Sequence, residues 1–375
     1  MYGLEHAGIG RYVENLVKHL AERRDFKLVL FVRKKKRGQI GLRCSRHLEI
    51  VEADFPHYSF REQIFLPFVL YKAHCDLIHF PHFNVPFFYF KPFVVTIHDL
   101  IKHESRGRQT TTRFPLLYWL KYLGYLFLMW WTVKRAKKIV VPSNFVKEKL
   151  LASYHLDPQK VVVIYEGGER VGKSQIPNPK SQKETLRKYR IKKPYLLYVG
   201  SVYPHKNVER LIEAVKLVNK KQKTENKKQV QLVIVCGRSV FWERLKAKVK
   251  KMEAEKWVNL VGFVPDDDLV ILYQNAQAFV FPSLSEGFGL PGLEAMACGC
   301  PVLCSDIPVF REIYGEVALY CDPLDVRDIV VKIEQVMSQP SLRKKLIKKG
   351  WQQTKKYSWQ KMTEKTVKVY KSCFG

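Results

Sequence analysis

Two glutamates enclose a glycine-rich segment, SEGFGLPGLEAMACG, which runs from residue 285 to residue 299. Glu286 and Glu294 have seven residues between them, and three of those seven are glycine. A glycine-rich turn from a strand into a helix exposes backbone N–H groups at the positive helix end, where a diphosphate can bind. Carboxylates are poor phosphate ligands, but they accept hydrogen bonds from sugar hydroxyls. The spacing therefore fits a ligand that carries both phosphate and sugar, and it equally fits a structural helix start beside a solvated turn.

The elements on either side of this segment determine where the two carboxylates would lie. The run AFVF (278–281) predicts a strand, and Pro291 suits the first position of the next helix because its missing N–H group is not needed there. Glu286 is then expected in the connecting loop, and Glu294 in the first turn of the helix.

Apolar, β-branched runs recur along the whole chain, with helical patterns between them, for example at 207–220 and 325–337. The runs are continuous rather than alternating, which is typical of strands that are buried on both faces. This order predicts an α/β protein with doubly wound parallel sheets. The predicted strands cover residues 27–32, 48–51, 77–80, 93–97, 138–141, 161–165, 195–199, 231–236, 278–281, 301–304 and 317–320.

The length of 375 residues exceeds what one hydrophobic core usually holds, so two domains are expected. A polar stretch at 168–192, with glycines and prolines and no strand pattern, is the predicted linker. We expect one domain over 1–170 and a second over 190–355.

The beginning of the chain departs from the usual order of such a domain. A doubly wound domain normally opens with a buried strand, then a glycine turn, then a helix. A turn at Gly8–Gly10 and a following helix are predicted, but the first seven residues, MYGLEHA, are no apolar strand. We expect that the first strand is missing because the sequence as given starts after it. The first sheet should then have an open slot with unpaired backbone groups.

The charge favours anionic partners. Lys and Arg number 65 against 35 Asp and Glu, which gives a net charge of +30. Nucleic acid, phosphates and an acidic membrane surface all fit such a charge. The basic residues are spread along the chain and no nucleic-acid-binding motif is recognised, so no specific nucleic acid is expected.

The most apolar stretch, at 114–133, is long enough to cross a bilayer, but Lys121 lies in its middle and Pro115 and Gly124 interrupt it. A helix docked on the sheet is the simpler interpretation. Its many aromatic residues and the VKRAKK segment at 133–138 also suit a membrane interface, so peripheral contact with an anionic membrane is expected.

The cysteines do not form a pattern typical of secreted proteins or of metal sites. The chain has eight, with no signal peptide, which favours a reduced, cytoplasmic setting. Cys298, Cys300 and Cys304 crowd together without a nearby histidine and are predicted to be small core residues. No D-x-D pair follows a strand, and the acidic run at 266–268 indicates a helix N-terminus. No metal is expected.

Five segments, in order, carry a family resemblance: GIGRYVENL (8–16), TIHDLI (96–101), YVGSVYPHKNVERLIEAV (198–215), VNLVGFVPDDDLVILYQNAQAFVFPS (258–283) and EGFGLPGLEAMACGCPV (286–302). Together they resemble the family 4 retaining glycosyltransferases. The resemblance implies the GT-B fold, in which two Rossmann-like domains face each other across a cleft. It also implies that a C-terminal helix, at 356–374, crosses back to the first domain.

The resemblance also implies roles for individual residues. His98 would contact the donor sugar near the reacting carbon, Glu286 would contact sugar hydroxyls, and Lys206 would neutralise the diphosphate leaving group. Ser201 stands where the family often has a basic residue, so either Lys206 carries more of the charge or another cation such as Arg238 replaces the missing one. The remaining donor-binding residues are Gly10 toward the diphosphate, Glu294 toward the ribose, Phe263 in the base-binding stretch, and the amides near Phe288, Gly289 and Leu290. His82 and Asn84 are candidates on the acceptor side.

The expected activity is transfer of a hexose from a GDP- or UDP-linked sugar to a glycan or lipid-linked acceptor, with retention of configuration. The motif context most resembles mannosyltransferases, so mannose from GDP-mannose is the predicted donor group. No cofactor and no metal are expected, and the enzyme should work in the cytoplasm, at the inner face of the membrane. The alternatives are a nucleotide-sugar epimerase of the same fold, a basic nucleic-acid-binding protein, and a degenerate transferase that binds without turnover.

Overall fold

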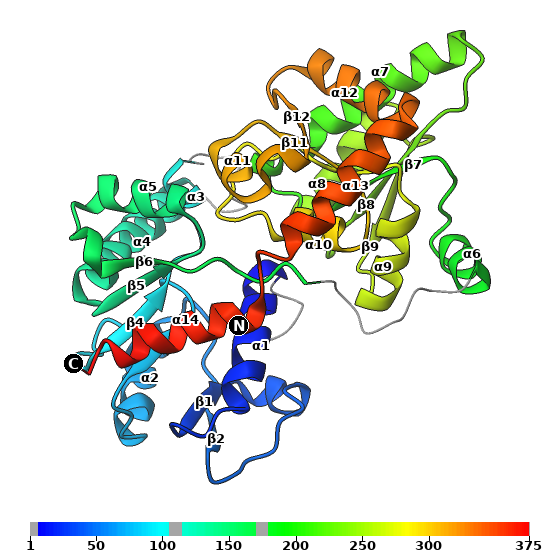
Figure 1. Ribbon diagram of the computed structural model, residues 1–375. Helices are drawn as coiled ribbons and strands as arrows, with labels where there is room; N and C mark the ends of the chain where they lie inside the picture. Colours follow the sequence, from blue (N-terminus) through cyan, green and yellow to red (C-terminus); the bar gives the residue numbers. More distant parts are fainter. Residues whose placement is uncertain (1–6, 105–114, 170–178, 375) are drawn as a thin grey trace. The chain divides into compact units, whose positions relative to one another are not determined.

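The computed structural model describes residues 7–104, 115–169 and 179–374 (Figure 1). The chain divides into two compact units. The first unit contains the described residues up to Gly167 together with the C-terminal segment from Trp359, and the second runs from Gly168 to Ser358. Each unit is built from parallel strands and helices, as the continuous apolar runs predict.

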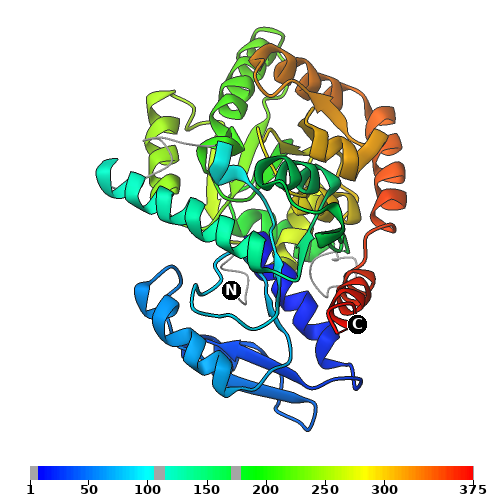
Figure 2. The same cartoon turned by 90° about the vertical axis from the view of Figure 1, so that its left-hand side faces the viewer.

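The first unit holds two separate parallel sheets, β1-β2 and β3-β4-β5-β6. Helix α14 packs on α1 in both views (Figures 1 and 2). The elements are α1 (Ala7–Ala21), β1 (Leu28–Val32), η2 (Lys34–Gln39), β2 (Leu48–Glu52), α2 (Phe60–Lys72), β3 (Ile78–Phe80), β4 (Phe93–Thr96), α3 (Ile101–Glu104), α4 (Pro115–Arg135), β5 (Lys138–Val141), α5 (Asn144–Tyr154), η4 (Pro158–Lys160), β6 (Val161–Val163) and α14 (Trp359–Lys371).

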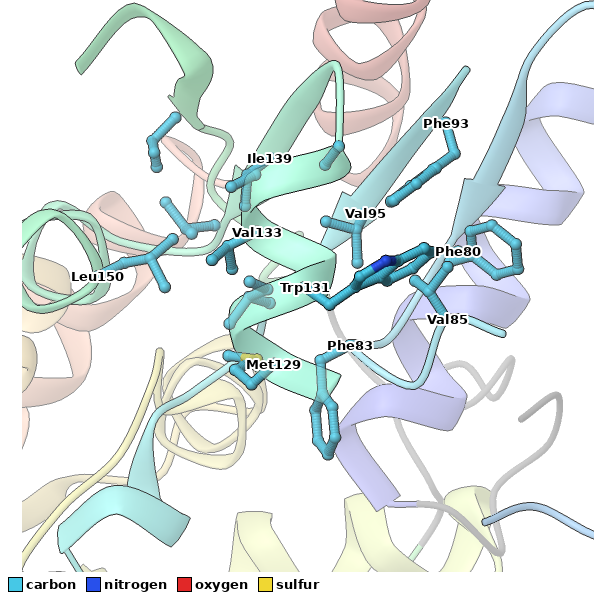
Figure 3. Packing of buried hydrophobic residues seen from close by; sticks show 14 of the residues in the cluster. Phe80, Phe83, Val85, Phe93, Val95, Met129, Trp131, Val133, Ile139 and Leu150 are labelled. Carbon is cyan, nitrogen blue, oxygen red and sulfur yellow. The ribbon is translucent and has the colours of Figure 1, made fainter. Parts of the chain in front are cut away.

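The core of this unit lies between the four-stranded sheet and one face of α4 (Figure 3). Trp131 stacks on Phe93 of β4, with ring centroids 6.1 Å apart. Met129 and Val133 of the same helix are fully buried. The predicted docking of the 114–133 helix on the sheet is therefore confirmed for the described part of the helix. Within the described ranges, no helix is both long and apolar enough to cross a membrane.

The second unit holds one parallel sheet in the order β12-β11-β10-β7-β8-β9. Its elements are α6 (Pro179–Lys188), β7 (Tyr195–Val199), η5 (Pro204–Lys206), α7 (Val208–Thr224), β8 (Gln231–Val235), α8 (Val240–Lys251), β9 (Val258–Gly262), α9 (Asp266–Asn275), β10 (Ala278–Phe281), α10 (Leu290–Ala297), β11 (Val302–Ser305), α11 (Pro308–Tyr314), η6 (Gly315–Val317), β12 (Leu319–Cys321), α12 (Val326–Ser338) and α13 (Pro340–Thr354).

Each predicted strand overlaps an observed one, but the sequence analysis missed β9. The run VNLVG has Asn259 as its second residue and ends in glycine, so it lacks the continuous apolar pattern that marks the other strands. The acidic residues from Asp266 to Asp268 form the first turn of α9, as predicted. The polar stretch at 168–192 contains α6, and its residues 170–178 lie outside the described ranges.

The expected slot in the first sheet is present. In the described part of the chain, β1 pairs only with β2 and β3 pairs only with β4. A cavity of about 980 Å³, called here the β1–β3 groove, is lined by Leu28–Val32 on one side and by residues 78–80 on the other. The predicted turn at Gly8–Gly10 is wrong, because these residues lie within the first turn of α1. Gly10 is therefore a buried helical residue.

Candidate active site

The order of strands in the second unit selects one edge of its sheet as a binding site. From β7 the chain adds β8 and β9 on one side and then returns to place β10 on the other side. The carboxyl ends of β7 and β10 therefore flank a topological switch point. Open parallel α/β sheets bind their ligands at such a point, outside the carboxyl ends of the strands.

Two residues predicted to act on the donor meet at this point. Lys206 follows β7 and Glu286 follows β10, and the distance from Nζ of Lys206 to Oε1 of Glu286 is 2.6 Å. Their side chains are only 14% and 10% exposed, and the ammonium also lies 5.7 Å from the ring centroid of Phe281. Because the pair is nearly buried, the two opposite charges neutralise each other when no ligand is bound. A phosphate oxygen could accept a hydrogen bond from the Lys206 ammonium, and a sugar hydroxyl could donate one to the Glu286 carboxylate.

Hydrogen bonds to backbone carbonyls hold the loops that carry this pair. The amide of Leu284 donates to the carbonyl of His205 at 2.8 Å. Asn207, a buried residue with φ of 58°, donates from Nδ2 to the carbonyls of Pro282 and Pro323 at 3.0 and 2.7 Å. The sequence analysis missed Asn207, although asparagine is one of the few residues that adopt this left-handed conformation readily.

His205 lies in the same loop as Lys206. Its side chain is partly buried and stacks on Tyr203 with ring centroids 5.9 Å apart. Burial, and to a smaller degree the charge of Lys206, lowers the pKa of His205 to about 3. The imidazole therefore adds no positive charge to the site at neutral pH.

The glycines of the opening segment are required by packing. Gly289 has φ of +93°, and a Cβ atom there would lie 2.8 Å from Cε1 of Phe310. The hydroxyl of Tyr314 donates to the Gly289 carbonyl and also fills the space beside Gly292. These glycines therefore have a structural reason for their presence, because two core aromatic rings close against the backbone.

Three predicted donor residues on this segment are buried. Glu294 is 4% exposed, and Phe288 and Leu290 are 4% and 5% exposed. The expected place of Glu294 in the first helical turn is wrong, because α10 begins at Leu290 and Glu294 lies in its second turn. Because the Glu294 carboxylate is buried, a ligand group can reach it only by entering the site.

The other predicted donor residues follow the neighbouring strands. Ser201 comes after β7, and its carbonyl accepts a hydrogen bond from the hydroxyl of Tyr198 at 2.5 Å. Arg238 follows β8, is exposed, and lies 5.8 Å from the ring centroid of Trp242. Phe263 follows β9 and is 62% exposed. The candidate donor residues of this unit thus come from the carboxyl ends of four adjacent strands, β10, β7, β8 and β9.

In the first unit, His98 follows β4 and is held through both ring nitrogens. Its Nε2 atom donates to the carbonyl of Pro81 at 3.1 Å, and its Nδ1 atom lies 3.1 Å from Oε1 of Glu166. A carbonyl only accepts, so a second proton must lie between the imidazole and the carboxylate for that contact to be a hydrogen bond. Glu166 was missed by the sequence analysis, although it follows a predicted strand directly.

A buried chain of hydrogen bonds holds the aromatic ring that packs against His98. His79 binds the hydroxyl of Tyr370 on α14 at 2.6 Å and the hydroxyl of Thr96 at 2.8 Å. Thr96 also binds the hydroxyl of Tyr12 on α1 at 3.0 Å, and the Tyr12 ring packs edge-on against His98. The chain joins two helices and two strands, and it therefore fixes the orientation of the His98 ring.

The acceptor-side candidates belong to a separate polar cluster beside His98. The amide of Asn84 donates to Oε2 of the buried Glu62 at 2.7 Å, and the ring of His82 lies 3.3 Å from the hydroxyl of Tyr58. Burial, followed by the nearby charge of His98, lowers the pKa of His82 to about 2. This imidazole stays neutral and can exchange hydrogen bonds with a hydroxyl group.

The cysteines behave as predicted, since Cys298, Cys300 and Cys304 are buried core residues. In the described ranges, no group of three or more histidine, cysteine, aspartate or glutamate residues has a metal-binding arrangement.

Solved structures define the class of the fold. Sucrose-phosphate synthase from Thermosynechococcus elongatus matches with a TM-score of 0.73 at 20% identity, over 98% of this chain and 94% of its own. WaaG, a glycosyltransferase involved in lipopolysaccharide biosynthesis, matches with 0.72 at 16% identity, over 98% and 96%. At these identities the likeness shows the fold, which is that of the GT-B glycosyltransferases.

Family models define the family. The model described as Glycosyltransferase Family 4 matches residues 6–167, and the model described as Glycosyl transferases group 1 matches residues 181–353. The chain therefore belongs to the family 4 glycosyltransferases.

Several curated relatives are named as mannosyltransferases. O-antigen chain mannosyltransferase B of Escherichia coli is 33% identical over 240 residues, which cover 63% of this chain and 61% of the relative. O-antigen chain mannosyltransferase RfbU of Salmonella typhimurium is 36% identical over 214 residues, covering 57% and 55%. The chain thus spans somewhat more than half the length of these relatives.

Proposed function

We propose that this protein transfers a mannosyl group from a nucleotide-linked sugar, GDP-mannose, to a glycan or lipid-linked acceptor during assembly of a polysaccharide. The observation that carries the proposal is the Lys206–Glu286 pair at the switch point, because it places a cation and a sugar-hydroxyl acceptor side by side. The names of the two relatives, both O-antigen mannosyltransferases, support the choice of sugar and of acceptor class.

The proposed chemistry is electrostatic at the leaving group. As the bond between the sugar and the diphosphate breaks, negative charge grows on the diphosphate, and the Lys206 ammonium stabilises it. Glu286, released from its ion pair, accepts hydrogen bonds from the sugar hydroxyls. His98 is the residue that we propose to contact the sugar, and the acceptor attacks the face from which the diphosphate leaves, so that configuration is retained.

We further propose that Lys206 takes the place of a metal ion in this step. A single ammonium beside the diphosphate supplies positive charge without a bound cation. Turnover measured in buffer with a chelator should then equal turnover with added Mg²⁺ or Mn²⁺. A rate that rises several-fold with either ion would contradict this part of the proposal.

The donor is tested by thermal unfolding with a panel of nucleotide sugars, including GDP-mannose, UDP-glucose and the free nucleoside diphosphates. A ligand at ~100-fold excess over its Kd stabilises the folded state by roughly 2.7 kcal/mol, which is a measurable rise in Tm. GDP-mannose should give the largest rise. A panel without any shift would argue against a nucleotide-sugar site.

A second measurement separates transfer from the alternatives. An epimerase converts the donor without an acceptor, so sugar analysis after incubation with donor alone should show unchanged mannose. A nucleic-acid-binding protein would bind duplex or single strands in a salt-dependent way and would ignore the sugar panel.

We also propose that the first unit contacts an anionic membrane through an aromatic surface formed by α2, the loop at 86–90 and α4. Phe60 and Phe68 are 88% and 68% exposed on α2, and Leu123 is 60% exposed on α4. The loop joins the two helices: the Phe90 amide donates to the hydroxyl of Tyr71, and the ring of Phe87 packs on Phe127. The other exposed members of the surface are Ile64, Phe65, Phe88, Phe90, Trp119, Leu120 and Trp130.

Basic residues accompany this surface. Arg61 and Lys72 on α2 are exposed, as are Lys121, Lys134 and Arg135 on α4. Large exposed apolar patches beside cations are typical of proteins that bind the headgroup region of anionic bilayers. A lipid-linked acceptor would lie within reach of such a surface.

A further inference from the structure

Glu166 is a buried carboxylate at the carboxyl edge of the four-stranded sheet. The residue is 5% exposed, and its Oε1 atom lies 3.1 Å from Nδ1 of His98. Among the residues that the structure describes, His98 is the one hydrogen-bond and ion-pair partner of this carboxylate. A buried carboxylate is costly unless an opposite charge or several donors compensate it. The contact with His98 must therefore supply most of that compensation.

The fold brings the two side chains together without a ligand. His98 follows β4 and Glu166 follows β6, and these strands flank β5 in the sheet. The segment after Glu166 is held by packing, because the indole of Trp359 on α14 lies against Gly167 and leaves no room there for a Cβ atom. The sheet and this close packing thus determine where the carboxylate lies.

Both ring nitrogens of His98 face hydrogen-bond acceptors. Nε2 lies 3.1 Å from the carbonyl oxygen of Pro81, and Nδ1 faces the Glu166 carboxylate. A neutral imidazole carries one N–H group and can satisfy only one of these acceptors, whereas an imidazolium donates to both. The buried charge of Glu166 favours the imidazolium, because the cation and the anion then neutralise each other.

Three titratable groups lie near His98 on neighbouring elements, and none of them is charged at neutral pH. Burial is the main cause that lowers the pKa of His79 to about 3 and that of His82 to about 2. Burial, and to a smaller degree the charge of Glu166, raises the pKa of Tyr12, whose ring packs edge-on against His98. These three groups therefore supply no counter-charge to an imidazolium.

Two charged residues close to His98 in sequence have other partners. The carboxylate of Asp99 accepts from the amide of Ile101 at 3.0 Å, at the start of α3. The ammonium of Lys102 lies 5.1 to 5.3 Å from the centroids of three aromatic rings. Within the described ranges, Glu166 is thus the carboxylate in contact with this imidazole.

We propose, on the basis of the proposed transferase function, that Glu166 is a positioning residue that keeps His98 doubly protonated, so that Nε2 offers an N–H group to an oxygen of the donor sugar. Without sugar, the carbonyl of Pro81 accepts this hydrogen bond. A sugar oxygen takes its place when the donor binds. Because Glu166 balances the imidazolium, the pair adds no net charge beside a sugar that becomes positive as its bond to the diphosphate breaks.

The variant Glu166→Gln tests this role because it keeps the size of the side chain and removes its charge. We expect kcat to fall by about 10- to 100-fold, the range typical for loss of the outer partner of an oriented histidine. KM for the donor should stay nearly unchanged, because the balance of charge matters most in the transition state. Glu22, 3.7 Å from His19 at the surface of α1, provides the control Glu22→Gln, which should keep the kcat of the unchanged protein.

A double-mutant cycle separates positioning from direct action. In a protein that already carries His98→Gln, Glu166→Gln should cause no further loss of kcat, because the ring through which Glu166 acts is gone. Losses that multiply would show that Glu166 acts independently of His98, and they would overturn the proposal.

NMR of the ring nitrogens, in protein with isotope-labelled histidine, reads the protons without any measurement of activity. We expect both nitrogens of His98 to carry a proton at neutral pH in the unchanged protein, and only one in Glu166→Gln. The signal that disappears in His98→Gln identifies the residue. A singly protonated ring in the unchanged protein would overturn the proposal, and this result does not require that any Glu166 variant folds.

Failure of this role and failure of the proposed function give different results. If the unchanged protein transfers mannose from GDP-mannose and Glu166→Gln keeps its kcat, the function stands and the positioning role is wrong. If the unchanged protein binds no nucleotide sugar, the proposed function is wrong, whereas the NMR measurement still decides how many protons the His98 ring carries.

Discussion

Lys206 is the residue on which the proposed chemistry depends most directly. Its ammonium is paired with Glu286 and nearly buried, whereas Lys221 pairs with Glu334 at the surface, 55% exposed. We expect Lys206→Ala to lower kcat by about 100-fold or more, because charge on the diphosphate grows in the transition state. Steady-state kinetics with saturating donor measures this, and Lys221→Ala should stay within two-fold of the unchanged protein.

Removal of Lys206 also leaves a buried carboxylate without its cation. The double variant Lys206→Ala/Glu286→Gln restores neutrality, and Lys206→Arg keeps the charge. If kcat is unchanged in Lys206→Ala and only KM rises, Lys206 binds ground state and transition state equally and does not promote bond breaking.

Glu294 offers a test of the ribose contact. The carboxylate is 4% exposed in the second turn of α10, and hydrogen bonds to a charged acceptor contribute ~1.5–3 kcal/mol. Glu294→Ala should therefore weaken binding of the free nucleoside diphosphate by roughly 10- to 150-fold, as read by titration calorimetry. Glu316, whose side chain is 86% exposed, provides the control Glu316→Ala, for which Kd should not change. An unaltered Kd in Glu294→Ala would remove the ribose role.

At the scale of single elements, two helical glycines make a matched pair. A Cβ atom at Gly292 in α10 would collide with the buried Tyr314 ring, whereas Gly124 in α4 has no atom within 4 Å of such a Cβ among those described. Gly292→Ala should cost about 1–3 kcal/mol of unfolding free energy through overpacking. Gly124→Ala should gain about 0.5–1 kcal/mol, because alanine favours the helix. Chemical denaturation measures both, and equal effects would contradict the packing explanation.

His79, in the hydrogen-bond chain between α14, β3 and β4, makes the stability of the fold depend on pH. Burial, and then the charge of His98, lowers the pKa of His79 from 6.5 to about 3. Between these values the unfolded chain binds the proton and the folded chain does not, so stability is full above pH 6.5 and is lost as the pH falls.

The variant His79→Gln isolates this contribution. The slope of unfolding free energy against pH, measured between pH 4.5 and 6.5, should become less steep by at most about 1.4 kcal/mol per pH unit. Above pH 7 the two slopes should coincide. Identical slopes over the acidic range would show that His79 is protonated in the folded state.

At the scale of the whole molecule, the net charge of +30 and the aromatic surface act together. The protein should sediment with vesicles that contain anionic lipid, and less so at high salt, since basic residues near such a surface contribute ~1 kcal/mol each and are screened. Phe60→Ser/Phe68→Ser should reduce the bound fraction several-fold. Trp351→Ser, at an aromatic residue of the second unit that is 54% exposed, should not. Equal recovery in the supernatant with and without vesicles would contradict membrane contact.

Much of the architecture is determined by the sequence alone. Buried parallel strands need apolar side chains on both faces, so runs such as LVLFV and AFVF are readable without a structure. The strand β9 was not predicted because Asn259 and the terminal glycine shorten its apolar run, and its pairing with β8 forms only in the folded sheet.

The partners of the site residues were decided by tertiary structure. Lys206 and Glu286 are 80 residues apart, and His98 and Glu166 are 68 apart. Local periodicity carries no information on such pairs, because they form only once the sheet order places the ends of β7 and β10, or of β4 and β6, at one edge. The same holds for Gly289, whose small size is required by Phe310, an aromatic residue distant in sequence that closes on it only when the core is packed.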